Sequence, residues 1–204
     1  ESTPFYLYDT NHVPKRIKKT CPWTKFIVML RDPVKRAFSQ CSMLIDKNEI
    51  EGRNFEQHLQ WDLNRMIQVG LVSNRTLSPI EEDLAWARYQ DHRRWRKAMI
   101  GRGFFEYQLR KWFEYFPREQ FLIIDSQDLD HDRNATLQRV YEFLGLPDFD
   151  LPIRGNKIHR RKYKNEMLDN VRDFLYEFYE PYNKRLAQLL GPEWDKKWEK
   201  PETS

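Results

Sequence analysis

Residues 25–39 of this chain read KFIVMLRDPVKRAFS, a short apolar run that passes directly into a polar segment beginning with Arg-Asp-Pro. An apolar run of this length, bounded by turn residues, is typical of a strand buried on both faces of a parallel sheet. Asp32 is a favourable N-cap, and Pro33 suits the first turn of a helix. The pattern therefore predicts a strand that ends at Leu30 and a helix that begins at Pro33.

The junction between this strand and this helix is a candidate anion site. Arg31 follows the strand at a point where free backbone N–H groups and the helix dipole favour negative charge. Its guanidinium offers a planar set of donors that matches phosphate oxygens. Ser39 lies about two helical turns further on, so its hydroxyl can face the same side. From the residues alone, a structural ion pair between Arg31 and Asp32 or another acid is an equally good interpretation.

A second strand followed by a helix is predicted later in the chain. Residues 120–126 form another apolar run, and residues 132–144, closed by Gly145, predict the helix after it. Further helices are predicted near residues 14–19, 55–69, 79–95, 104–116 and 166–190. This alternation indicates one α/β domain over residues 1–204 with a parallel sheet, and a helical insertion at about residues 47–99.

The composition narrows the classes of partner. The chain has 204 residues, with 35 basic and 31 acidic side chains and a net charge of +4. This excess favours anionic ligands but is far below that of a dedicated nucleic-acid-binding protein, so we expect no nucleic-acid partner. The residue spacings match no metal site, and we expect no metal. Cys21 and Cys41 are expected to be buried free thiols.

Residues 26–39 resemble the second cofactor motif of sulfotransferases that use 3′-phosphoadenosine 5′-phosphosulfate (PAPS) as the sulfuryl donor. In that motif a strand-end Arg and a Ser in the next helix hold the 3′-phosphate, so the resemblance implies this role for Arg31 and Ser39. Segments within residues 1–17, 103–129 and 137–147 resemble heparan sulfate sulfotransferases in the same order. The resemblance implies the sulfotransferase type of α/β fold, with a P-loop-NTPase-like parallel sheet flanked by helices.

A cationic segment, KIHRRKY at residues 157–163, precedes the last predicted helix. Such a segment can close over a diphosphate-like ligand, although a solvated basic loop is the default for an isolated run. Its position resembles the family's late basic loop, which wraps PAPS and ends in Arg-x-Tyr, although Arg160 stands where the family has glycine. The resemblance implies nucleotide contacts from Lys157, Arg160, Arg161, Lys162 and Tyr163.

Two functional parts of the family are absent from this sequence. One is the Gly/Lys-containing loop that binds the 5′-phosphosulfate, and the other is the acidic general base of the heparan sulfate enzymes. We therefore interpret the chain as N-terminally incomplete, with a degenerate, non-catalytic protein as the alternative. The catalytic residue is left unassigned, and His12 and Asp9 are weak candidates for a base.

The resemblance as a whole implies transfer of a sulfuryl group from PAPS to a hydroxyl or amine, on a carbohydrate such as a glycosaminoglycan, with adenosine 3′,5′-bisphosphate as product. A P-loop nucleotide phosphotransferase and a non-catalytic module for anionic polymers stay open as alternatives. Glycan-modifying members sit in the Golgi lumen behind an N-terminal membrane anchor, where the sequons at Asn74 and Asn134 would matter for a glycoprotein. Bacterial relatives are soluble and cytoplasmic, so the compartment is left open.

Overall fold

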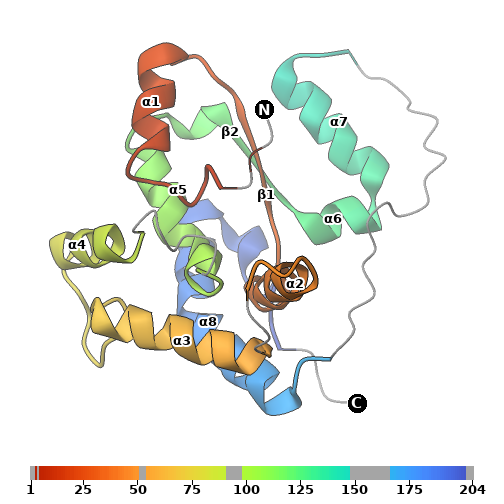
Figure 1. Cartoon of the computed structure of the whole chain (residues 1–204). Helices are drawn as coiled ribbons and strands as arrows, with labels where there is room; N and C mark the ends of the chain where they lie inside the picture. Colours follow the sequence, from red (N-terminus) through yellow and green to blue (C-terminus); the bar gives the residue numbers. More distant parts are fainter. Residues whose placement is uncertain (1–2, 4, 51–53, 91–97, 148–165, 201–204) are drawn as a thin grey trace.

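A computed structural model describes residues 3, 5–50, 54–90, 98–147 and 166–200 of the chain. Its described strands, β1 (Phe26–Leu30) and β2 (Phe121–Asp125), pair in parallel, with Phe26 opposite Phe121 and Leu30 opposite Asp125. Both strands and their parallel arrangement were predicted from the two apolar runs. The helices α1 (Val13–Thr20) and α5 (Phe105–Phe113) lie on one side of the strands in Figure 1.

One face of the two strands forms an apolar core with α1, α5 and the C-terminal segment. Phe26, Phe116 and Phe121 contact one another there, and the ring centroids of Phe26 and Phe121 are 4.7 Å apart in a stacked arrangement. The prediction that β1 is buried on both faces is wrong for the described structure. Ile27 is 44% exposed and Met29 is 52% exposed, because only the alternate side chains of this strand point into the core.

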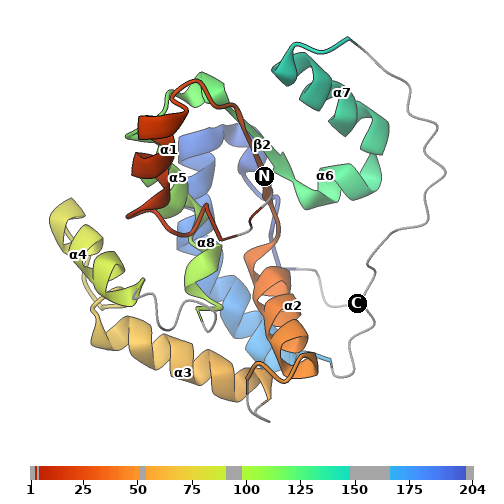
Figure 2. The same ribbon diagram turned by 45° about the horizontal axis from the view of Figure 1, so that its top comes forward.

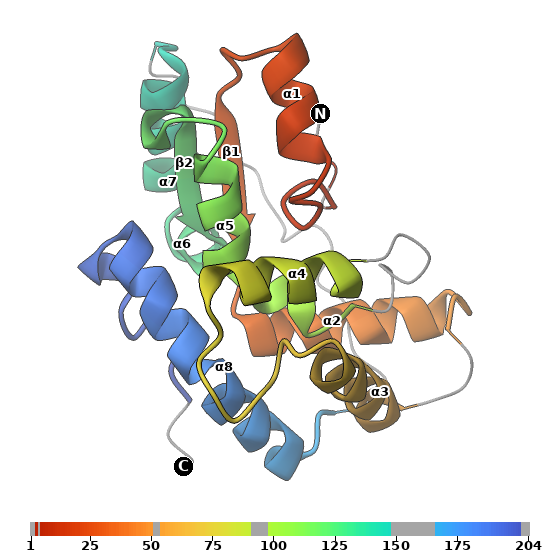
Figure 3. The same ribbon diagram turned by 90° about the vertical axis from the view of Figure 1, so that its left-hand side faces the viewer.

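A second core lies beyond the carboxyl ends of the strands. It is formed by α2 (Pro33–Asp46), α3 (Phe55–Gln68), α4 (Pro79–Tyr89) and part of α8 (Asp169–Leu190). Figure 3 shows α2, α3 and α4 gathered below the strands, with the long α8 running past both cores. The helices α3 and α4 fall within the predicted insertion, and α3 matches the helix predicted near residues 55–69.

The remaining helices follow β2. Asp125 ends β2 and caps α6 (Ser126–His131), a short helix that was not predicted, and α7 (Arg133–Leu144) follows directly. Gly145 ends α7 with φ of +74°, a left-handed conformation that glycine adopts without steric cost, as predicted. Figures 1 and 2 both show α6 and α7 on the side of the strands opposite to α1 and α5.

Two helix ends differ from the prediction. α5 ends at Phe113, although apolar spacing continues to Phe116, because the chain turns before Pro117 and Phe116 packs as part of that turn. α4 ends at Tyr89, and residues 91–97, over which the helix was predicted to continue, lie outside the described residues.

Candidate anion site at the strand–helix junction

Asp32 holds the junction between β1 and α2 in place. It is buried, and its Oδ1 accepts hydrogen bonds from the backbone N–H groups of Val34 at 2.8 Å and Lys35 at 3.1 Å. Its Oδ2 accepts a hydrogen bond of 2.8 Å from the hydroxyl of Tyr176 on α8. Asp32 therefore acts as the predicted N-cap, with Pro33 in the first helical turn.

These contacts correct one part of the predicted anion site. The sequence suggested free backbone N–H groups at the start of α2, but Asp32 accepts those of Val34 and Lys35 through its side chain and that of Arg36 through its carbonyl. Pro33 has no N–H group. An anion at this junction would consequently be held by side chains and by the helix dipole, with Arg31 as the first contact.

Arg31 is exposed at the carboxyl end of β1. In the described part of the chain no carboxylate lies within ion-pair distance of it, so the alternative of a structural ion pair with Asp32 is not what the structure has. Burial lowers the pKa of the Arg36 guanidinium, and the nearby charge of Arg31 acts in the same direction. The positive charges of Arg31 and Arg36 thus act on each other at this junction, and together they favour an anion.

The other predicted nucleotide ligands divide into two groups. Ser39 is partly buried in α2, eight residues after Arg31. The basic segment with Lys157, Arg160, Arg161, Lys162 and Tyr163 lies outside the described residues. The proposed convergence of Arg31, Ser39 and this segment on one phosphate therefore stays a prediction.

The two weak catalytic candidates lie in direct contact. His12 Nδ1 is 2.9 Å from Asp9 Oδ1, and the same oxygen accepts a hydrogen bond of 3.2 Å from the His12 backbone N–H. The Asp9 side chain is 10% exposed, whereas that of His12 is 42% exposed. A carboxylate in this position favours the imidazole tautomer that carries its proton on Nδ1.

Most of the aromatic side chains between residues 86 and 107 pack in the core and are not available to line a sugar-binding cleft. Trp86, Tyr89, Phe104, Phe105 and Tyr107 are all at most 5% exposed. Trp95 lies outside the described residues. Both cysteines are free thiols, but only Cys41 is buried; Cys21 is exposed in the turn after α1, which corrects that prediction.

Sequence reasoning missed a group of guanidiniums in the second core. Arg36 on α2, Arg65 on α3 and Arg102 in the short 3₁₀ helix Gly101–Gly103 approach a common region around Asp62 and Tyr89. These arginines come from three segments that are distant in the sequence, so no local spacing of residues predicts that they meet.

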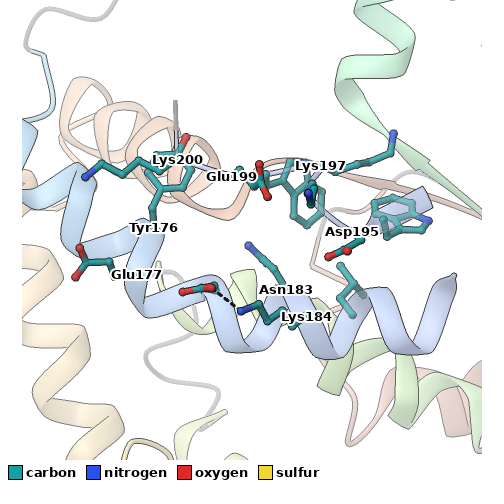
Figure 4. Close-up of a pocket in the computed structure, with 13 residues that line it drawn as sticks. Tyr176, Glu177, Asn183, Lys184, Asp195, Lys197, Glu199 and Lys200 are labelled. Carbon is teal, nitrogen blue, oxygen red and sulfur yellow. Dashed lines mark hydrogen bonds and ion pairs between the residues drawn. The ribbon is translucent and has the colours of Figure 1, made fainter. Parts of the chain in front are cut away.

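A cavity of about 380 Å³ lies between α8 and residues 194–200. Figure 4 shows Asn183 and Lys184 on one wall and Asp195 on the other. Lys197 closes the neighbouring edge by pairing with Asp128 at 2.7 Å. None of the predicted site residues that the structure describes lines this cavity.

Two features are absent from the described residues. No helix among them combines the length and apolar character needed to cross a membrane. No cluster of three or more His, Cys, Asp or Glu side chains in those same ranges could hold a metal ion.

The family model and the similar proteins described next are all sulfotransferases. Residues 3–150 match the model of the sulfotransferase family. The chain is similar to human heparan sulfate glucosamine 3-O-sulfotransferase 6, with 27% identity over 94% of the chain and 54% of that protein. It is also similar to carbohydrate sulfotransferase 15 of Mus musculus, with 30% identity over 84% of the chain and 31% of that protein.

A solved structure has the same fold. The crystal structure of a sulfotransferase from Alicyclobacillus acidocaldarius aligns with a TM-score of 0.65 and 24% identity, covering 94% of this chain and 65% of that one. The chain thus spans about half or less of the length of these two curated relatives.

Proposed function

The chain belongs to the sulfotransferase family, and on this premise we propose that its function is to transfer a sulfuryl group from PAPS to a hydroxyl or amine of a carbohydrate acceptor. The observation that carries the proposal is the exposed Arg31, which lies at the end of β1 and the start of α2 with no described carboxylate as its partner. A guanidinium placed in this way fits a phosphate group.

In this proposal Arg31 and Ser39 bind the 3′-phosphate, and the basic segment at residues 157–163 covers the nucleotide. The donor supplies a sulfur atom that gains a bond to the acceptor oxygen or nitrogen as its bond to the leaving phosphate oxygen breaks. The protein's contribution is to position the reactants and to stabilise charge on the leaving oxygen. In this proposal His12, whose Nδ1 is 2.9 Å from Asp9 Oδ1, accepts the acceptor's proton.

The acceptor is proposed to be a glycan because heparan sulfate and carbohydrate stand in the names of the similar proteins. In this proposal the protein shares three properties with the glycan-modifying members of the family. These are location in the Golgi lumen, a membrane anchor and N-linked glycans. Asn74 fits the last of these, because it lies exposed in the connection between α3 and α4.

The decisive experiment measures binding of adenosine 3′,5′-bisphosphate by calorimetry. Arg31→Ala is expected to cost about 2–5 kcal/mol of binding free energy, because a desolvated charged hydrogen bond is lost. Arg16→Ala, on the exposed side of α1, is the matched control and is expected to leave the affinity unchanged. Equal affinity in both variants would remove Arg31 from the site, and absence of binding in the unmodified protein would contradict the proposed function.

A further inference from the structure

The cavity between α8 and residues 194–200 has an apolar, aromatic floor. Its volume of about 380 Å³ lies within the roughly 300–1,000 Å³ that is usual for small-molecule sites. Its buried lining residues are each at most 7% exposed: Tyr176, Leu186, Trp194 and Trp198. The ring centroids of the two tryptophans are 5.6 Å apart. Such a floor favours a ligand with an apolar or aromatic body.

The mouth of the cavity is rich in carboxylates. Its exposed acidic residues are Glu177 and Glu180 on α8 and, on the opposite wall, Asp195 and Glu199. Glu180 pairs with Lys184 at 2.6 Å. Within the described ranges no ion pair joins the other three carboxylates to a cation of the protein. They are therefore free to meet a cationic group of a ligand.

Two of the lysines that line the cavity are bound to acids outside it. Lys197 pairs with Asp128 at 2.7 Å, and Lys200 pairs with Asp173 at 3.0 Å. Neither of these two acids lines the cavity. The two remaining lysines of the lining stand against four carboxylates, so the mouth carries a surplus of negative charge. A surplus of this kind favours a cationic ligand.

The aromatic floor is itself suited to a positive charge. Lys197 Nζ lies 5.4 Å from the ring centroid of Trp194, so a ring of this floor contacts a cation within the protein. Figure 4 shows Asn183 projecting from α8 into the space between the two walls, where its amide oxygen can accept from an ammonium N–H. Ring faces, an amide and carboxylates thus surround one space.

We propose that this cavity binds an organic cation, a protonated primary amine carried on an aromatic or aliphatic body. The body packs on Leu186, Trp194 and Trp198, and the ammonium meets the carboxylates at the mouth. Neither Arg31 nor Ser39 lines the cavity, so the site is separate from the proposed nucleotide site. The inference does not depend on the proposed function.

The test compares three ligands of similar shape that differ in charge: phenethylamine, phenethyl alcohol and phenylacetate. Each is titrated against the protein near neutral pH and followed by ligand-observed NMR. The amine is expected to bind about tenfold more tightly than the alcohol, because the ring faces and the carboxylates both attract its charge. Phenylacetate is expected to bind most weakly. A saturating concentration of adenosine 3′,5′-bisphosphate is expected to leave the amine bound.

Two double variants separate the cavity from the general charge of the protein. Glu177→Gln with Asp195→Asn removes one carboxylate from each wall, and it is expected to weaken the amine about fivefold and to leave the alcohol unchanged. The charge-matched control is Glu166→Gln with Glu193→Gln, two exposed acids that do not line the cavity. It is expected to stay within about twofold, because salt screens distant exposed charges. Asn183→Phe fills the space and should abolish binding of both amine and alcohol.

Several results would overturn the inference. Equal affinity for amine and alcohol would mean that the cavity selects apolar bodies without regard to charge, and tighter binding of phenylacetate would assign the mouth to its lysines. Equal losses in the two double variants would reduce the effect to net charge. Binding that persists in Asn183→Phe would place the amine elsewhere, and its displacement by adenosine 3′,5′-bisphosphate would make the cavity part of the nucleotide site.

Discussion

The hydroxyl of Tyr176 on α8 donates a hydrogen bond of 2.8 Å to Oδ2 of Asp32, the residue that caps α2. The two residues are 144 positions apart in the chain. The bond therefore ties the last long helix to the junction that carries Arg31. Because the other oxygen of Asp32 is occupied by α2, the orientation of the junction depends on both helices.

Tyr176→Phe is expected to lower the free energy of unfolding by about 1.5–3 kcal/mol, because a buried carboxylate loses a hydrogen bond. Urea denaturation at pH 7 measures this change. Tyr182→Phe is the control on the same helix, since its hydroxyl has no hydrogen-bond partner among the described residues, and it should change stability by less than about 0.5 kcal/mol. Equal losses in the two variants would mean that Tyr176 acts through packing alone.

Gly103 is a second point at which the core meets the junction. An added Cβ would lie 2.8 Å from Pro33 Cβ and 2.8 Å from the ring of Tyr179. We expect Gly103→Ala to destabilise the fold by about 1–3 kcal/mol through overpacking, and to weaken nucleotide binding by displacing the start of α2. Gly145→Ala, where no atom lies within 4 Å, should cost only the strain of its positive φ, about 1–2 kcal/mol, and leave binding intact. Thermal unfolding and nucleotide titration of both variants provide the comparison.

The local elements near the junction were predictable because their signals are local. The apolar run before Arg31, the cap at Asp32 and the proline after it all lie within a few residues of the boundary they specify. The exposure of Ile27 and Met29 was not predictable in this way. Burial depends on which elements cover a strand, and the strand's own residues carry no information about its neighbours.

Contacts that form only in the folded chain explain the other differences. The contact of Asp9 with His12 spans three residues, and both side chains were singled out, but only the helix start that brings them together makes them a pair. The guanidiniums of Arg36, Arg65 and Arg102 meet through packing of three segments, which no spacing rule describes.

The two thiols are expected to differ sharply in reactivity. Burial raises the pKa of the Cys41 thiol to about 12, so almost no reactive thiolate exists at neutral pH, whereas Cys21 is exposed. A thiol-reactive chromogenic disulfide should modify one cysteine in the native protein and two after denaturation. Rapid reaction of both thiols under native conditions would contradict the packing of α2.

Asp62 should give the stability a distinctive pH dependence. Burial raises its pKa from 3.8 to about 6, so the folded chain binds this proton more tightly than the unfolded chain does. The contribution of Asp62 to stability is therefore greatest at low pH and falls as the pH rises from about 4 to about 6. At neutral pH the buried charge costs up to about 3 kcal/mol relative to the protonated form.

The measurement for Asp62 is the difference in unfolding free energy between the protein and Asp62→Asn, followed from pH 4.5 to pH 7.5. Asparagine carries no charge; its one carbonyl oxygen can accept from the Ile100 N–H, while its NH2 group can donate to the Tyr89 hydroxyl. The stability of the protein relative to the variant should decline across this range and level off above about pH 7. A relative stability that rises with pH would show that an arginine neutralises Asp62.

The contact between His12 and Asp9 makes the most direct prediction about catalysis. If His12 accepts the acceptor's proton through Nε2, then His12→Gln should lower kcat roughly 10²-fold or more and leave the affinity for adenosine 3′,5′-bisphosphate unchanged. Asp9→Asn keeps the size of the side chain but removes the charge that holds the proton on Nδ1, so it should reproduce much of this loss. His131→Gln at the exposed end of α6 is the control for the general effect of losing a histidine.

The pH–rate profile separates a base from a structural residue, because only the loss of a base removes the fall in kcat on the acidic side. Full activity in His12→Gln, or an unchanged acidic limb with reduced activity, would place the base elsewhere in the protein.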